Sequence, residues 1–418
     1  MTYQNLAKRD KEVFEILKKE AKRQNEELEL IASENYVSIP VLEAMGTILT
    51  NKYSEGYPGK RYYGGNQIID EIEILAISRA KELFGAEHVN VQALSGSPAN
   101  AAVYMAFLEP GDKVLGLKLD HGGHLSHGHA INFSGRLYNF VQYGVDLESG
   151  LINMEEVRKI ALREKPKMIV AGFSAYSREI DWQEFKNIAD EVGAYTFADI
   201  AHIAGLIAGK QLNNPVPIFD VVSTTTHKTL RGPRGALIMC KEKFAKQMDR
   251  AVFPGMQGGP HDHITAAKAV ALGEALKPEF IDYSKQVILN AKQMSRSLID
   301  LGYHIISGGT DNHLFVVSLV KQGITGKEAE KALEKAGISV SRSTIPNDPN
   351  PPLNPSGLRI GTPAITTRGM KEEQMKIVAS YIDKALKNKD NEKVLLEVKE
   401  DIKNLCKNFP LPSDKLEY

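Results

Sequence analysis

Residues 221–235 read VVSTTTHKTLRGPRG, and this stretch carries the strongest indication of both fold and chemistry. Its β-branched start predicts a strand, and its Gly/Pro/Arg end predicts a loop. Lys228 therefore follows the end of a strand, beside hydroxyl groups and the imidazole of His227, with no carboxylate near it in sequence. Such surroundings can lower the pKa of a lysine and leave the nucleophilic amine that a Schiff base requires.

A second signal lies upstream, and it is needed because a lysine chosen at random is far more often a solvated surface residue. Residues 194–202 read AYTFADIAH, which predicts a strand with Asp199 at its carboxyl end and His202 just beyond. Pyridoxal phosphate requires a lysine for its aldehyde and an aspartate that keeps its ring nitrogen protonated. The order strand–Asp199, strand–Lys228 therefore points to a site for this cofactor.

Long motifs in the chain resemble those of the serine hydroxymethyltransferase family. The lysine motif at 223–235 is one, and the others are 29–36, 51–65, 121–125 and 356–363. The resemblance extends over nearly the whole chain. It implies an α/β fold of type I among pyridoxal-phosphate enzymes. We expect a large domain with a mostly parallel seven-stranded sheet between helices, a smaller α+β C-terminal domain and an N-terminal helical arm.

The composition limits the alternatives. A chain of 418 residues forms two or three packing units, and we expect limits at 1–66, 67–280 and 281–418. The 52 Lys and Arg residues equal the 52 Asp and Glu residues in number, so no overall charge favours nucleic acid or an anionic membrane. Two cysteines are too few for a disulfide framework. No apolar segment is long enough to span a bilayer, and the first ten residues lack a signal-peptide core, so we expect a cytoplasmic protein.

Hydrophobic periodicity predicts the main elements around these motifs. An exposed amphipathic helix is expected over residues 5–28, where it would pack on a partner surface, and one long helix is expected from about 261 to 300. The other expected helices are 68–84, 182–192 and 326–336, with a helical tail from 371. The other expected strands are 90–94, 113–117, 167–173, 236–240 and 314–319.

Ser95, Gly96 and Ser97 form the expected phosphate site. Small residues let the backbone approach an anion, and a helix N-terminus offers free N–H groups. We expect Ser97 to be the N-cap and Pro98 the first helical residue. The signal is weak by itself, because a plain helix cap has the same pattern. The family more often carries glutamine in place of Pro98, so one side-chain donor is missing here.

Histidines at 121, 124 and 127 suggest a zinc site, but no carboxylate or cysteine accompanies them at ligand spacing, so we expect no metal. The resemblance instead implies that the His124 ring stacks on the cofactor. It implies that Ser174, at the end of a strand, donates to the cofactor's phenolic oxygen. The residues implied near a folate are Leu119, Gly123, His124 and Leu125.

The loop at 53–65 contains many tyrosines and glycines and has no periodicity, which is more typical of a binding surface than of a simple connection. The resemblance implies that Tyr53, Glu55 and Tyr63 act in catalysis and substrate binding. It also implies that they serve the cofactor of a neighbouring subunit, together with Gly258 and Gly259. A homodimer with shared active sites is therefore expected.

The expected reaction follows from the resemblance. Serine displaces Lys228 as an external aldimine, Arg359 holds its carboxylate, and the Cα–Cβ bond breaks. Tetrahydrofolate, the co-substrate, takes up the one-carbon unit as 5,10-methylenetetrahydrofolate and leaves glycine, with Glu55 as the acid/base. The resemblance places Ser33 and His202 at the substrate, His202 also at the cofactor, and His227 beside the lysine in catalysis. Asn354-Pro355 depart from the family's usual apolar residue and threonine.

Three interpretations compete. The first is a serine hydroxymethyltransferase, and the second is an aldolase or racemase that uses the same cofactor without folate. The third is a binding protein that retains the fold without the reaction. The presence of Lys228, Asp199, Arg359 and Glu55 argues strongly against the third, and residues 119–125 with the tyrosine loop favour the first over the second.

Overall fold

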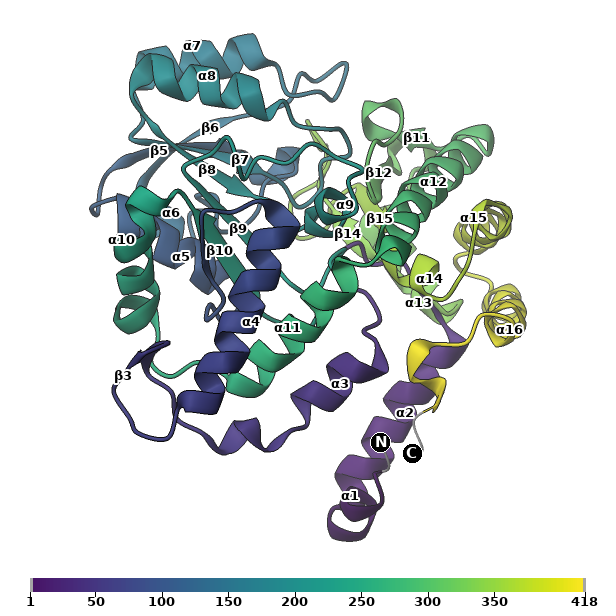
Figure 1. The fold of residues 1–418 in the computed structure, drawn as a ribbon. Coiled ribbons are helices and arrows are strands. Elements are labelled where there is room, and N and C mark those ends of the chain that lie inside the picture. The colour runs from purple at the N-terminus through teal and green to yellow at the C-terminus, as the bar shows by residue number, and fades with distance from the viewer. Residues whose placement is uncertain (1–2, 416–418) are drawn as a thin grey trace. The chain divides into compact units, whose positions relative to one another are not determined.

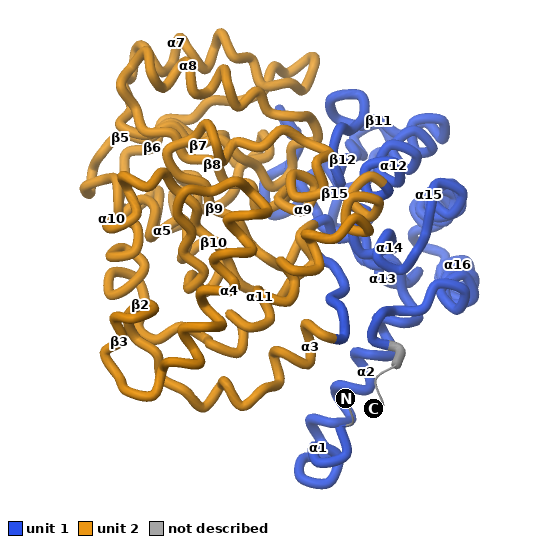
Figure 2. Tube along the Cα trace, in the orientation of Figure 1, with its two compact units in different colours: residues 1–39, 286–418 blue, residues 40–285 orange. Residues whose placement is uncertain are grey.

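The computed structural model describes residues 3–415 and divides them into two compact units. Unit 1 combines residues 1–39 with 286–418, and unit 2 comprises residues 40–285 (Figure 2). The domain limits expected from the sequence, at 66/67 and 280/281, stay predictions. No helix within the described residues is long and apolar enough to cross a membrane.

Unit 2 is built around a seven-stranded sheet in the order β4-β10-β9-β8-β7-β5-β6. The five strands from β9 to β6 are parallel, whereas β10 is antiparallel to both of its neighbours. The mostly parallel seven-stranded sheet is therefore confirmed. The strands are β4 His88–Asn90, β5 Lys113–Leu117, β6 Asn139–Tyr143, β7 Met168–Gly172, β8 Tyr195–Asp199, β9 Val221–Thr225 and β10 Ala236–Cys240.

Helices pack around this sheet, and every residue of its strands β7, β9 and β10 is buried. Continuous apolar or β-branched runs are what strands covered on both faces require. Figure 1 shows α7 beside α8, and α4 beside α11, pairs that also contact each other. The helices are α3 Ile39–Met45, α4 Gln67–Phe84, α5 Gly96–Phe107, α6 Phe133–Leu137, α7 Met154–Glu164, α8 Trp182–Val192, α9 Ala204–Ala208, α10 Ala245–Arg250 and α11 Asp262–Ala275; a short hairpin comprises β2 Gly56–Tyr57 and β3 Lys60–Arg61.

Unit 1 has its own core between a four-stranded antiparallel sheet, in the order β11-β12-β15-β14, and several helices. A further parallel pair joins β1 to β13. This is the smaller α+β unit that was expected. Its strands are β1 Leu28–Glu29, β11 His304–Ile305, β12 Leu314–Ser318, β13 Ile338–Ser339, β14 Ser341–Ser343 and β15 Gly357–Gly361, and its helices are α1 Gln4–Arg9, α2 Lys11–Glu26, α13 Gly326–Lys335, α14 Pro363–Thr367, α15 Glu372–Lys387 and α16 Glu392–Lys407. Helix α12 Pro278–Asp300 begins in the last residues of unit 2 and continues into unit 1.

Two helices expected to be continuous are broken. The helix expected at 5–28 divides at Asp10, whose side chain caps α2 by accepting from the Val13 N–H at 3.0 Å. The helix expected at 261–300 ends as α11 and restarts as α12 at Pro278. Proline lacks an N–H and crowds the preceding turn, so it favours the first turn of a new helix over the interior of an old one.

The start of α5 also differs from expectation. Its N-cap is Ser95, not Ser97, and its first helical residue is Gly96. Pro98 therefore lies within the first turn, where its missing N–H removes no intrahelical bond. The strand expected at 90–94 ends at Asn90 as β4, and extended chain leads from there to the helix.

Candidate active site

Parallel strands bring the predicted cofactor residues to one edge of the sheet. Asp199 is the last residue of β8 and pairs with Gly172 of β7 and Ser223 of β9. Ser174 and Lys228 follow the ends of β7 and β9 within a few residues. Ligands of open parallel sheets bind at the carboxyl ends of the strands, so this edge is the expected place for a site.

A cavity of about 180 Å³ lies at this edge. Its lining includes every predicted cofactor residue except Gly258 and Gly259, together with His227. It also includes four residues that the sequence did not single out, of which Phe173 and Ala201 adjoin predicted ones. The lining residues are Ser95, Gly96, Ser97, His124, Phe173, Ser174, Asp199, Ala201, His202, Thr225, His227, Lys228 and Arg234.

The amine of Lys228 has a defined orientation in this cavity. Its Nζ donates to Thr225 Oγ1 at 2.9 Å. His227 beside it is mostly buried, and burial, followed by the positive charges of Lys228 and Arg234, lowers the pKa of His227 to about 3. The imidazole of His227 is therefore neutral near pH 7 and adds no positive charge next to the amine.

Asp199 is buried and surrounded by donors. Its Oδ2 accepts from Asn100 Nδ2 at 2.8 Å and lies 3.1 Å from His127 Nε2, while its Oδ1 accepts from the Ala201 N–H at 3.0 Å. Burial acts to raise the pKa of Asp199, but these donors and the nearby histidine charges outweigh it and hold the pKa below its ordinary value. Asp199 is thus a permanent carboxylate suited to hold a protonated ring nitrogen.

The tautomers of two histidines follow from their backbone contacts. His127 Nδ1 accepts from the His124 N–H at 3.3 Å, so in neutral His127 the proton is on Nε2, facing Asp199. His124 Nδ1 accepts from the Ser126 N–H at 3.1 Å and lies 2.6 Å from Ser126 Oγ. Asn100 Nδ2 donates to Ser126 Oγ at 2.8 Å. The hydroxyl hydrogen of Ser126 is therefore used in a hydrogen bond to His124 Nδ1.

This supporting group of Asn100, Ser126 and His127 was not predicted from the sequence, where His127 stood out only as one of three closely spaced histidines. Ser223 Oγ completes it by donating to Asn100 Oδ1 at 2.7 Å, so the Asn100 amide uses both of its hydrogens and its oxygen. Three separate segments meet here. The signal available in the sequence was only an asparagine inside an alanine-rich helix, where a polar residue needs a buried partner.

His124, His127 and Asp199 each offer one ligand atom, and these atoms lie within 4.8 Å of one another, as a metal ion would need. However, the tautomer above directs the His127 proton at Asp199, and the Asn100 amide hydrogen points at the same oxygen. A metal ion between these three side chains would need a lone pair from each of them. The hydrogens that His127 and Asn100 direct at Asp199 Oδ2 are therefore unfavourable for a cation there. The group instead fits an aspartate held for a ring N–H.

The N-terminus of α5 supplies an anion site in the same lining. Ala99 N–H bonds to the Ser95 carbonyl, so the N–H groups of Gly96 and Ser97 precede the first intrahelical bond. A Cβ on Gly96 would lie only 2.8 Å from Thr225 Cγ2, so glycine is required there for close packing. Arg234 adds a guanidinium to the lining. A phosphate group fits these donors.

His202 is buried, and its ring stacks on Phe173 with centroids 6.5 Å apart. Its carbonyl accepts from the Thr229 hydroxyl at 2.9 Å, which joins the segment after β8 to the turn after the lysine. The Ser174 N–H donates to the Gly122 carbonyl at 2.7 Å. Both predicted residues therefore line the cavity in fixed positions.

A second group of predicted residues gathers in unit 2 but does not line the cavity. Tyr53 Oη donates to Glu55 Oε1 at 3.4 Å, and the Tyr53 and Tyr63 rings pack edge to face at 5.2 Å. A Cβ on Gly258 would lie 3.0 Å from Glu55 Oε1, and one on Gly259 would lie 3.4 Å from the Tyr53 ring. We call these five residues the loop group. The negative charge of Glu55 raises the pKa of Tyr53.

The predicted folate residues surround the turn after β5. Leu119 starts a short 3₁₀ turn, and Leu125 is 44% exposed. A Cβ on Gly123 would lie 2.2 Å from the Leu117 carbonyl oxygen, so only glycine fits. Their role toward a folate stays a prediction.

Two predicted substrate residues belong to unit 1. Arg359 on β15 donates from Nε to Ser341 Oγ at 3.1 Å, and burial lowers its pKa to about 10. It therefore remains a cation at neutral pH. Ser33 follows Ala32, and Ala32 packs closely against Gly361. A Cβ added to Gly361 would lie only 2.5 Å from Ala32 Cα. This packing fixes the segment that holds Ser33 against the strand that carries Arg359.

The fold and the cavity together define a class of protein. An aspartate at the end of one parallel strand, an amine after the next strand and an anion-binding helix N-terminus are the arrangement of a fold type I pyridoxal-phosphate enzyme. The cofactor fits the residues present, because the anion site suits its phosphate, the lysine amine its aldehyde and the aspartate its ring nitrogen.

Comparison with known proteins narrows the class to one family. The family model described as "Serine hydroxymethyltransferase" matches residues 6–382. Proteins named serine hydroxymethyltransferase from the Lens, Corby and Paris strains of Legionella pneumophila are each 57% identical over 404 residues, which is 96% of this chain and 97% of the relative.

This chain belongs to the serine hydroxymethyltransferase family. It is a transferase that uses pyridoxal phosphate and passes the hydroxymethyl carbon of serine to tetrahydrofolate, giving glycine and 5,10-methylenetetrahydrofolate. The first of the three interpretations drawn from the sequence is confirmed.

Proposed function

We propose that the residues lining the cavity perform this reaction in the roles that their geometry supports. Bound pyridoxal phosphate supplies an aldehyde and a ring that draws electrons from the α-carbon of the amino acid. Lys228 supplies the amine that holds the aldehyde, and Asp199 keeps a proton on the ring nitrogen. The single observation that carries this proposal is the Asp199 carboxylate, buried among three donors in the cavity that contains the lysine amine.

The other roles follow from the chemistry of each side chain. The N–H groups of Gly96 and Ser97 receive the phosphate, with Ser95 as their helix cap, and His124 faces the ring. We assign the carboxylate of serine to the planar guanidinium of Arg359, because a fork of donors binds a carboxylate at two points.

The remaining substrate contacts are assigned to Ser33, His202 and Tyr63. Ser174 donates to the phenolic oxygen of the cofactor, and neutral His227 leaves the lysine amine without an added positive neighbour. Glu55 moves the proton as the Cα–Cβ bond of serine breaks. Leu119, Gly123, His124 and Leu125 are assigned to the folate.

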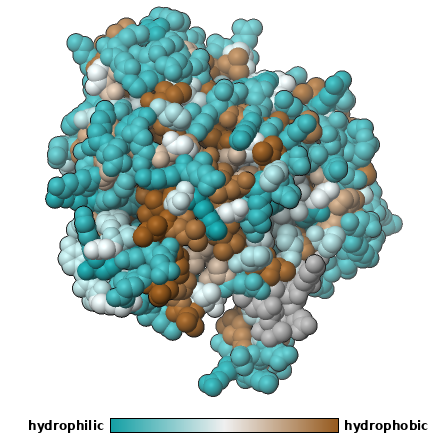
Figure 3. All heavy atoms as spheres, viewed as in Figure 1, coloured by the Kyte–Doolittle hydropathy of each residue, from teal (hydrophilic) through white to brown (hydrophobic). Residues whose placement is uncertain are grey.

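We further propose a homodimer in which the loop group of each subunit serves the site of the other. Three observations support it. The loop group does not line the cavity of its own chain. Hydrophobic side chains also gather on the face shown in Figure 3. Separately, α4 exposes Ile68, Ile74 and Leu75 by 63%, 53% and 44%. Exposed apolar surface of this kind is typical of a covered interface.

The same proposal places the enzyme in the cytoplasm. Cys240 and Cys406 are both buried and form no disulfide bond, as is usual in a reducing compartment.

One experiment tests the assigned lysine. Lys228→Ala should remove serine cleavage and the visible absorbance that a covalent link between cofactor and lysine produces, while circular dichroism stays unchanged. Lys210→Ala, on an exposed lysine outside the cavity, is the matched control. Retention of the visible band by Lys228→Ala, without added amine, would show that another residue holds the aldehyde.

A second assay tests the substrates. Glycine should form from serine at a high rate only when tetrahydrofolate is added. Equal rates with and without tetrahydrofolate would favour a folate-independent aldolase, which uses the same amine and aspartate.

A further inference from the structure

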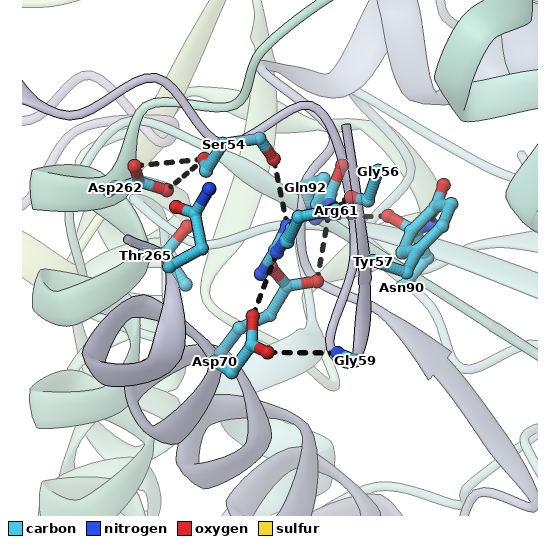
Figure 4. A network of polar contacts seen from close by, with 12 residues as sticks. Ser54, Gly56, Tyr57, Gly59, Arg61, Asp70, Asn90, Gln92, Asp262 and Thr265 are labelled. Carbon is cyan, nitrogen blue, oxygen red and sulfur yellow. Dashed lines mark hydrogen bonds and ion pairs between the residues drawn. The ribbon is translucent and has the colours of Figure 1, made fainter. Parts of the chain in front are cut away.

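The segment that carries Glu55 is fixed by a buried ion pair. Arg61 Nη2 lies 2.6 Å from Glu73 Oε2, and only 4% and 2% of these two side chains are exposed. Arg61 Nη1 donates to the carbonyls of Ser54 and Gly56, both at 2.8 Å. One guanidinium therefore holds the peptide on both sides of Glu55, as Figure 4 shows.

Gln92 reaches the same segment from the other direction. Its Nε2 donates to the Gly56 carbonyl at 2.9 Å and to Glu73 Oε1 at 2.8 Å, and its backbone carbonyl accepts from Gln257 Nε2 at 2.8 Å. Gln257 immediately precedes Gly258 and Gly259. Gln92 is 2% exposed, and it is bonded to both segments that make up the loop group.

The backbone around Gln92 is itself held in place. Lys268, which is 2% exposed, donates from Nζ to the carbonyls of Val91 and Ala93 at 2.6 and 3.0 Å, and to that of Ala236 at 2.9 Å. Burial lowers the pKa of Lys268 to about 7, and its amine still donates to carbonyls on both sides of Gln92. Gln92 is therefore a fixed point to which the two loop segments are attached.

We propose that Gln92 is a positioning residue that holds the loop group in the geometry required by the active site of the partner subunit. This inference rests on the shared-site dimer proposed above. Gln92 does not line the cavity, and its side-chain amide acts through the Gly56 carbonyl and through Glu73, the ion-pair partner of Arg61. Loss of its amide removes the donor to Glu73 Oε1 and one of the two donors to the Gly56 carbonyl, which then depends on Arg61 alone, so the segment around Glu55 loosens.

Gln92→Met is the informative variant. Methionine keeps the length and volume of the side chain and removes only the amide group. Gln92 Oε1 has no hydrogen-bond partner among the described residues, so the loss is confined to the donors. Gln183→Met, at an exposed position on α8, is the matched control.

Hybrid dimers separate an effect on the partner from an effect on the same chain. One chain carries Lys228→Ala and the other carries Tyr53→Ala. Only the hybrid then has a complete site, formed by the lysine of the second chain and the loop group of the first. Gln92→Met on the Lys228→Ala chain should lower serine cleavage by about 10- to 100-fold, since a displacement of about 1 Å is costly.

The same substitution on the Tyr53→Ala chain should change the activity by less than about twofold, because its loop group faces a site without lysine. The reverse pattern, equal losses in both positions or no loss in either would overturn the proposal. If the starting pair without Gln92→Met shows no activity, the shared-site dimer fails instead, and the two failures are distinguishable.

Amide hydrogen exchange on the holoenzyme gives a readout besides activity. The Tyr62 N–H bonds to the Glu55 carbonyl at 3.0 Å and reports directly on this segment. Exchange at residues 54–63 should be faster in Gln92→Met than in wild type, with no change in Gln183→Met. Unchanged exchange in Gln92→Met would overturn the proposal.

Discussion

At the scale of single residues, the charge of Asp199 is set by groups that never touch the substrate. Burial alone would raise the pKa of Asp199, and donors such as His127 and Asn100 reverse that effect. His127 can donate only because the His124 N–H occupies its other nitrogen. A backbone contact therefore decides the protonation state of a catalytic carboxylate.

This arrangement predicts a shift in the pH profile. In His127→Phe the carboxylate of Asp199 loses a donor while burial remains, so its pKa rises. The ionised form is then lost at higher pH, and the acid limb of kcat/KM for serine should move to higher pH. His129→Phe, which alters a half-buried histidine nearby that is not bonded to Asp199 in the structure, is the control. An unmoved limb in His127→Phe would contradict the assigned role.

Glu55 can be tested by its dependence on the substrate. Glu55→Gln keeps the size and hydrogen bonding of the side chain but cannot exchange a proton. Folate-dependent cleavage of serine should fall by roughly two to four orders of magnitude, as is usual for a lost general acid or base. Cleavage of a β-phenyl hydroxyamino acid without folate should fall much less. Equal losses on both substrates, measured as kcat/KM, would make Glu55 structural.

The sequence was sufficient for residues whose position depends on local pattern. Lys228 and Asp199 each stand after a β-branched or apolar run, so the ends of their strands were predictable. Asn100 and His127 were missed, because their role arises from tertiary contacts between α5, the turn after β5 and the end of β8. The local sequence around Asn100 and His127 does not indicate that their side chains form hydrogen bonds with Asp199.

At the scale of elements, one arginine joins the ends of two helices in unit 1. Arg368, which is 4% exposed, donates to the carbonyls of Gln24, Asn25 and Glu27 at the end of α2. It also donates to two carbonyls at the end of α16. Carbonyls at a helix C-terminus lack partners and carry negative partial charge, so a buried guanidinium satisfies both needs.

Arg368→Met should therefore destabilise unit 1. Five carbonyls lose a donor at once, although that of Cys406 still accepts from the Phe409 N–H and that of Glu27 from the Cys406 thiol. The carbonyls of Gln24, Asn25 and Phe409 lose the donor that Arg368 provides, and at about 1–3 kcal/mol for each unsatisfied buried group we expect a loss of about 3 kcal/mol or more. The thermal unfolding midpoint of the holoenzyme checks this. Arg342→Met, which removes a partly exposed arginine paired with Glu330, should have little effect. Equal midpoints for the two variants would argue against the capping role.

Element boundaries show where local pattern is insufficient. Continuous amphipathic periodicity predicted single helices at 5–28 and 261–300, yet Asp10 and Pro278 divide them. Both residues carry recognisable stop or start signals, since aspartate caps helices and proline favours a first turn. In these two places the local backbone chemistry outweighed the hydrophobic period.

At the scale of the whole molecule, the loop group does not line the cavity of its own chain, and the shared-site dimer proposed above can be tested directly. Mixing Tyr53→Ala and Lys228→Ala subunits should restore activity, although each is inactive alone. Random association gives hybrids as about half of the dimers, and each hybrid has one complete site out of two, so roughly a quarter of the wild-type activity is expected.

Lys228→Ala mixed with Asp199→Asn is the control. Both changes lie in the cavity of one chain, so every site of that hybrid is damaged and no activity should return. Activity in the control, or none in the first mixture despite proven subunit exchange, would exclude shared sites.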